Sequence, residues 1–142
     1  MRVSFCALAF LILPAGFAGA EEILVPAGGK TEWRYLDGRA APGENWTTSG
    51  FDDSGWKKGK APLGYGKDGL GTVIQFGDDP ADKPITAYFR KTFKVGPREK
   101  HDFAELGLSV TYDDGVAIYL NGTEVARDNL EAGKLTARSR AK

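Results

Sequence analysis

The dipeptide Asn121-Gly122 constrains the fold of this chain more than any other feature. It lies between two β-rich runs, and Asn-Gly is the strongest short signal for a β-hairpin, because a type I′ turn needs positive φ at both central residues. The run 116–120 alternates large apolar residues with Ala117 and Tyr119, the period of a strand with one buried face. The sequence therefore predicts an antiparallel hairpin over 116–127.

The first twenty residues are expected to be a signal peptide rather than part of a folded domain. Arg2 supplies a positive charge, Phe5 to Leu13 form a short apolar run, and Ala18-Gly19-Ala20 provides a small-residue cleavage site. The apolar run is too short to span a bilayer comfortably, and no later run is long enough. Cleavage near Ala20 predicts a secreted or periplasmic protein without a membrane span, in which residues 21–142 are expected to be the N-terminal portion of one domain.

Composition excludes several classes of function. Cys6, the only cysteine, lies inside the predicted signal peptide, so disulfide scaffolds, cysteine nucleophiles and thiolate zinc sites are excluded for the mature chain. The chain has 19 basic and 19 acidic side chains with no block of like charge, which gives no electrostatic support for binding nucleic acid or an anionic membrane.

The remainder is predicted to be all-β. Residues 37–71 are rich in turn-forming residues but also in aromatics, which predicts an ordered loop whose aromatic side chains close the ends of a sheet core. No segment has the apolar stripe of a helix. The last residues, 136–142, are polar and are expected to bury almost nothing. Besides the hairpin, strands are predicted at 23–25, 31–36, 72–76, 85–95 (the longest) and 104–112.

Five motifs occur in a recognisable order: Trp33-Arg34-Tyr35-Leu36-Asp37-Gly38, Phe51-Asp52-Asp53-Ser54-Gly55-Trp56, Ala61-Pro62-Leu63-Gly64-Tyr65-Gly66, Tyr88-Phe89-Arg90-Lys91-Thr92-Phe93 and Asp113-Asp114-Gly115 followed by Tyr119-Leu120-Asn121-Gly122. Over about Lys30 to Asn129 this pattern resembles the galactose-binding-domain-like jelly rolls of secreted bacterial multidomain proteins. Such a domain is an antiparallel β-sandwich, and its pattern normally continues for two or three strands after the hairpin. The resemblance therefore implies an incomplete jelly roll.

The same resemblance implies a non-catalytic, carbohydrate-binding-like module with a glycan or cell-surface polysaccharide as its partner. Relatives of this kind sit beside a C-terminal catalytic domain, so the chain could also be the N-terminal portion of a metallophosphoesterase (purple-acid-phosphatase-like) or a glycoside hydrolase. A spacer domain without ligand is a third alternative. His101, the only histidine, lies in a polar turn, and no serine has a nucleophile-elbow context, so this segment is not expected to be an enzyme.

Two sets of candidate site residues follow. Trp46, Tyr65 and Asn121 could bind a sugar, because aromatic rings stack on the apolar C–H faces of pyranoses, although the aromatic residues could equally pack in the core. Asp113 and Asp114 resemble the Asp-Asp-Gly turn of PA14-type lectin domains and could help to hold Ca²⁺, which needs six to eight oxygen ligands.

Turn chemistry alone also explains each pair of aspartates. Asp113 and Asp114 could simply cap a tight turn. Asp52-Asp53-Ser54 could form a cation loop, but an Asx turn that orients Trp56 into the core is favoured.

Overall fold

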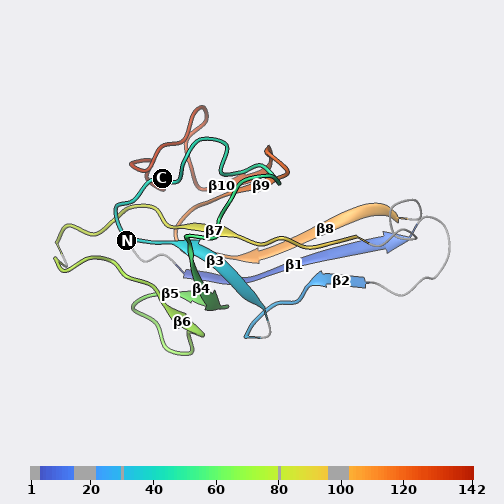
Figure 1. Ribbon diagram of the computed structural model, residues 1–142, viewed down its shortest axis with the longest axis horizontal. Coiled ribbons are helices and arrows are strands. Elements are labelled where there is room, and N and C mark those ends of the chain that lie inside the picture. The colour runs from blue at the N-terminus through green and yellow to red at the C-terminus, as the bar shows by residue number, and fades with distance from the viewer. Residues whose placement is uncertain (1–3, 15–21, 30, 80, 96–102) are drawn as a thin grey trace.

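The chain is described here from a computed structural model, which covers residues 4–14, 22–29, 31–79, 81–95 and 103–142 (Figure 1). All regular secondary structure in these residues is β, and they contain no helix, which confirms the all-β prediction. The strands are β1 (Ser4–Pro14), β2 (Glu22–Val25), β3 (Glu32–Leu36), β4 (Lys57–Lys60), β5 (Leu63–Gly64), β6 (Thr72–Val73), β7 (Tyr88–Arg90), β8 (Phe103–Thr111), β9 (Val116–Leu120) and β10 (Thr123–Asp128).

The strands form three sheets. The largest has the order β2-β1-β5-β6, with β8 paired to the other edge of β1. The second has β3 between β4 and β7, antiparallel to both, and the third is the β9–β10 hairpin. In Figure 1 the hairpin lies on one side of β3 and β7, and β5 and β6 lie on the other.

Strand β1 consists of residues that the sequence assigns to the signal peptide. Its backbone pairs antiparallel with β8 from Cys6↔Thr111 to Pro14↔Phe103, and with β2 and β5 on the opposite edge. Cleavage near Ala20 stays a prediction.

The core lies between β3 and the segment around β5 and β6. It consists of buried Tyr35, Ala61, Leu63, Tyr65 and Ile74, and we call it the core cluster. Leu63 and Ile74 are only 1% and 2% exposed. Burying side chains of this size contributes about 1.5–3 kcal/mol each, so this cluster accounts for much of the stability of the domain.

The β-hairpin is as the sequence predicts. Asn121 and Gly122 have φ of 50° and 89°, the positive values that a type I′ turn requires. Val116 and Ile118 are buried, and Thr123 pairs with Leu120 across the turn. The predicted strands at 23–25, 31–36 and 104–112 are also present, with ends shifted by a residue or so, and 72–76 is shortened to two residues.

Two predicted segments differ from the structure. The long strand predicted over 85–95 is regular only at β7, because its partner β3 offers a ladder from Arg34 to Leu36 and no further. The predicted loop 37–71 contains β4 and β5. The sequence Lys-Lys-Gly-Lys of β4 lacks apolar alternation, and its pairing with β3 places Gly59 against Thr72, where a Cβ would lie 2.6 Å from Thr72 Oγ1.

The C-terminal segment is mostly exposed, as predicted, but it is attached to the rest of the domain. Leu130 forms a bridge with Ala141, and the backbone N–H of Lys142 donates to Asn129 O at 3.1 Å. Thr86 Oγ1 donates to Ala137 O at 3.1 Å. Hydrogen bonds to backbone groups, one of them from the Thr86 side chain, therefore hold residues 129–142 in place.

Candidate functional site

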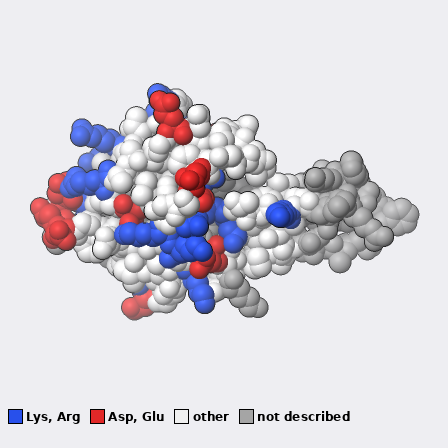
Figure 2. All heavy atoms as spheres, viewed as in Figure 1, with Lys and Arg blue, Asp and Glu red and all other residues white. Residues whose placement is uncertain are grey.

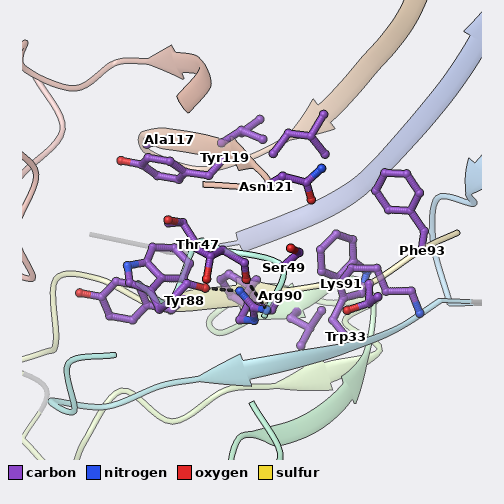
Figure 3. A pocket seen from close by; sticks show the side chains of 18 of the residues that line it. Trp33, Thr47, Ser49, Tyr88, Arg90, Lys91, Phe93, Ala117, Tyr119 and Asn121 are labelled. Carbon is purple, nitrogen blue, oxygen red and sulfur yellow. Dashed lines mark hydrogen bonds between the residues drawn. The ribbon is translucent and has the colours of Figure 1, made fainter. Parts of the chain in front are cut away.

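A cavity of about 330 Å³ opens between the hairpin and the β4-β3-β7 sheet. Figure 3 shows Ala117, Tyr119 and Asn121 of the hairpin on one wall, and Tyr88 and Arg90 of β7 on the other. We call it the aromatic cavity. Its remaining lining residues are Trp33, Trp46, Thr47, Thr48, Ser49, Ala61, Leu63, Ala87, Phe89, Lys91, Thr92, Phe93, Val95, Ile118 and Leu120.

Trp46 is the centre of an aromatic group at this cavity. Its ring meets Tyr88 edge-on at 5.2 Å between centroids and Tyr119 at 5.8 Å, so it joins the two walls. Trp56 stacks at 6.3 Å, and it is itself buried. Edge-to-face pairs of this kind contribute about 0.5–1.5 kcal/mol beyond their buried area. Trp46 is half-buried, and it is fixed in place before any ligand binds.

The backbone turn around Trp46 is attached to the hairpin. Asn45 has φ of 60°, and its carbonyl accepts the backbone N–H of Thr48 at 2.9 Å and Thr48 Oγ1 at 2.8 Å. The N–H of Gly122 donates to Thr47 O at 2.9 Å. The tip of the hairpin and the turn that carries Trp46 are thus held together across the mouth of the cavity.

Arg90 organises the β7 wall of the aromatic cavity. Its guanidinium donates to the carbonyls of Trp46 and Thr48, the latter at 3.1 Å, and its Nε lies 2.9 Å from Asp53 Oδ2. It also lies 5.1 Å from the centroid of the Phe51 ring. The side chain is only 11% exposed. Its charge is therefore matched inside the protein, and its donors are used to hold the turn.

The rim of the cavity offers neutral polar groups. Thr47, Ser49 and Asn121 line it, and Asn121 is exposed at the hairpin tip. Burial raises the pKa of Tyr88, and burial and then a hydrogen bond with Glu124 raise the pKa of Tyr119. Both phenols thus stay neutral at physiological pH. The arrangement suits an apolar ring face surrounded by hydroxyl groups.

The structure brings Trp46 and Asn121 together, as the sugar-site prediction requires, but Tyr65 does not join them. Tyr65 is 4% exposed in the core cluster, with its ring 5.0 Å from Phe76 and 5.3 Å from Lys83 Nζ. Sequence reasoning missed Tyr88 and Tyr119 as site residues. For Tyr88 the sequence carried one signal, because this residue falls on the opposite face of its predicted strand from most of the apolar residues.

The predicted calcium residues have protein partners. Asp113 Oδ2 lies 2.5 Å from Lys67 Nζ, and Asp114 O accepts Asn129 Nδ2 at 2.8 Å. Across the described ranges, no three His, Cys, Asp or Glu side chains gather closely enough to hold a metal ion. The contacts that Asp113 and Asp114 make are those of a turn fixed to its neighbours, and calcium binding there stays a prediction.

The Asx turn before Trp56 is confirmed. The backbone N–H of Ser54 donates to Asp52 Oδ1 at 2.9 Å, and this bond holds the pKa of Asp52 below its ordinary value. The N–H of Trp56 donates to Asp53 O at 2.9 Å, and the indole is buried. What the sequence did not predict is the second role of Asp53, whose carboxylate pairs with Arg90 and lies 3.7 Å from Arg34.

Comparison with family models finds no match, and comparisons with curated proteins and with solved structures find none either. Among the residues that the structure describes, no helix is long and apolar enough to cross a membrane. The case for a function therefore depends on the site itself.

Proposed function

We propose that this chain is a secreted, non-catalytic carbohydrate-binding-like module that holds a glycan in the aromatic cavity and so positions a neighbouring hydrolase. The observation that carries the proposal is the convergence of Trp46, Tyr88 and Tyr119 with the amide of Asn121 around one open cavity. The domain is proposed to be an incomplete antiparallel sandwich of the galactose-binding type. The hairpin facing the β4-β3-β7 sheet across the cavity supports two such layers.

The chemistry of the cavity supports a sugar in particular. Pyranose rings have apolar C–H faces and a polar rim, and the cavity has aromatic walls with hydroxyl and amide groups at its edge. Of the two cations that line the cavity, Arg90 is neutralised by Asp53, and the exposed Lys91 donates to Glu32 O at 2.9 Å, so a neutral sugar would not have to leave a buried charge unsatisfied. Because the rings are held by one another, little conformational entropy is lost on binding.

A spacer domain without ligand is the second candidate, and the aromatic packing favours it in part. Tyr65 is fully in the core, and Trp46 makes ring contacts to three other aromatic residues. If the domain is a spacer, the aromatic cavity is unfilled space in the core of an incomplete fold. The difference between the candidates lies in whether Trp46 and Asn121 contact anything outside the protein.

The experiment is a glycan array probed with the full chain, with and without Ca²⁺, followed by titration of the best oligosaccharide. Trp46→Ala is expected to weaken binding at least tenfold, as aromatic hot spots do. Asn121→Gly keeps the type I′ turn and removes only the amide, so a loss there reports a direct contact. Asp113→Asn tests the calcium prediction, because it alters binding only if the cation is required.

The control is Val73→Ala, a 70% exposed residue that does not line the cavity. If the chain binds no glycan on the array, with or without Ca²⁺, the proposal is overturned and the spacer domain remains.

A further inference from the structure

A second, larger groove of about 600 Å³ lies beside the aromatic cavity. It runs between the turn after β3, the segment 81–86 that leads into β7, and the C-terminal residues 137–140. Four cations line it, Arg39, Lys83, Arg138 and Arg140, with Asp82 as the only carboxylate among the described residues that do so. We call it the basic groove.

The positive charge of this groove is only partly neutralised inside the protein. Arg39 forms an ion pair with Asp82, and Lys83 Nζ lies over the rings of Phe76 and Tyr65, 4.7 Å and 5.3 Å from their centroids. In the part of the chain that the structure covers, no carboxylate pairs with Lys83, Arg138 or Arg140.

This excess is local. On the face in Figure 2, basic and acidic side chains are interspersed, and the chain has a formal net charge of zero. A groove with an excess of positive charge on a neutral protein is a feature of that site, and it raises the local concentration of an anionic ligand.

The wall that carries the two arginines is anchored. Thr86 Oγ1 donates to Ala137 O at 3.1 Å, the N–H of Thr136 donates to Ser139 Oγ at 2.9 Å, and the N–H of Arg138 donates to Thr136 Oγ1 at 3.2 Å. The guanidinium groups of Arg138 and Arg140 thus extend from a fixed backbone beside the entry to β7.

The basic groove and the aromatic cavity share a wall. Tyr88 lines both, with its neighbour Ala87 in the cavity and Thr86 in the groove. A linear ligand that stacks in the cavity and passes Tyr88 therefore enters the groove. The two sites together offer an aromatic platform followed by unpaired cations, which is a pattern for a polymer with apolar ring faces and anionic substituents.

We infer that the ligand is an acidic oligosaccharide, one whose sugar rings occupy the aromatic cavity and whose carboxylate or sulfate groups contact Lys83, Arg138 and Arg140 in the basic groove. The inference rests on the proposed carbohydrate function and specifies its class of ligand. Guanidinium groups bind a carboxylate or a sulfate with two parallel hydrogen bonds. The structure therefore points to an anionic ligand, and the experiment distinguishes carboxylate from sulfate.

The test compares three hexasaccharides by titration calorimetry with the full chain: an oligogalacturonate, its methyl ester, which is neutral but otherwise matched, and a sulfated hexasaccharide. At least one acidic ligand is expected to bind at least fivefold more tightly than the methyl ester, and this preference is expected to shrink as salt rises from about 20 to 500 mM.

In the variant R138Q/R140Q the ratio of acidic to neutral affinity is expected to fall by up to about 25-fold, since each exposed charge pair contributes up to about fivefold. K60Q/K134Q removes the same charge from exposed lysines outside the groove and is the matched control.

The outcomes separate the two proposals. Equal binding of the acid and its ester, or an equal loss of preference in K60Q/K134Q, overturns the acidic ligand and leaves the carbohydrate function. Binding of none of the three oligosaccharides overturns the acidic ligand, and the glycan array decides separately whether the carbohydrate function stands. Equal competition by a hexaglutamate peptide shows that charge alone is recognised and overturns the assignment to a sugar. For the inference to stand, R138Q/R140Q must lose the preference for the acidic ligands, and Trp46→Ala must weaken the binding of all three oligosaccharides.

Discussion

Tyr65 and Trp46 show how differently one domain uses aromatic residues that come from the same turn-rich stretch. Tyr65 is 4% exposed and packs with Leu63 and Ile74 in the core cluster. Trp46 is half-buried and packs with three other aromatic rings beside an open cavity, and its backbone carbonyl accepts from Arg90. One ring is enclosed in the core cluster, next to Phe76 and Lys83, whereas the other is fixed so that part of it still faces outward.

This difference teaches that the number of aromatic residues in a loop says little about binding. What distinguishes the two sites is the kind of support that each has. The core cluster is held by burial, which is strong and non-directional. The turn that carries Trp46 is held by the directional bonds of Arg90 and of Gly122, which fix its position without covering the ring. The predictions below test this contrast.

The largest effect is expected from Tyr65→Ala. Truncating a buried aromatic side chain leaves a cavity and loses about 3–5 kcal/mol of unfolding free energy. Urea unfolding followed by tryptophan fluorescence measures it. Tyr65→Phe, which keeps the ring, is expected to lose much less. A loss below about 1 kcal/mol for Tyr65→Ala would show that the core cluster is not the main source of stability, and would remove the contrast with Trp46.

The next effect concerns Arg90. Arg90→Met keeps the apolar contact with Phe51 but leaves Asp53 and two carbonyl oxygens without their donor, so it is expected to lose about 2–3 kcal/mol. Arg90→Lys is expected to recover only part, because an ammonium cannot span the same acceptors. Arg39→Met provides the control, since its ion pair with Asp82 is exposed and is expected to contribute about 1 kcal/mol or less.

If Arg90→Met and Arg39→Met lose the same free energy of unfolding, the turn around Trp46 does not depend on Arg90 for its position. A useful second readout is glycan affinity. The position of Trp46 depends on Arg90 in the proposal, so the Met variant is expected to bind more weakly even under conditions where it is fully folded.

The sequence predicts well whatever depends on neighbours along the chain. The hairpin at 116–127 and the Asx turn at Asp52 both arise from local backbone chemistry, and both are present. The strands with clear alternation, such as β3 and β8, are also present near their predicted bounds. These elements need no knowledge of what packs on them.

The parts that the sequence does not predict depend on distant partners. Strand β4 has no apolar pattern and exists because β3 pairs with it. Arg90 and Asp53 are 37 positions apart, so nothing in either motif shows that they form an ion pair. The basic groove combines a turn residue, a loop lysine and two C-terminal arginines, and no local run of charge marks it. The sequence alone also did not distinguish Tyr65 from Trp46, because the difference lies in what surrounds each ring.

A smaller effect on stability, paired with a larger one on binding, is expected from Trp46→Ala. The ring is only half-buried, so the variant is expected to lose about 1–2 kcal/mol, well below the loss from Tyr65→Ala. The same urea experiment measures it, and glycan titration is expected to show at least a tenfold loss in affinity. A Trp46→Ala variant as unstable as Tyr65→Ala would place Trp46 functionally in the core and favour the spacer.

The smallest effect is a pH dependence at the aromatic cavity. Burial raises the pKa of Tyr88 above its ordinary value near 10, and burial does the same for Tyr119, with a contribution from Glu124. The folded chain therefore keeps these phenolic protons after the unfolded chain has lost them. Since the unfolded state then binds fewer protons, stability is fully present below about pH 10 and falls as the pH rises through the folded pKa values.

Urea midpoints measured from pH 8 to 11 are expected to fall above pH 10 in the parent chain and to fall less in Tyr88→Phe, which has no phenol to ionise at that position. Absorbance at about 295 nm follows phenolate formation in the folded state. If Tyr88→Phe and the parent chain lose stability identically, the Tyr88 ring is more solvated than the cavity geometry indicates. The β7 wall of the proposed sugar site would then be open to water, and the contrast between the partly covered aromatic cluster and the buried core would be weaker.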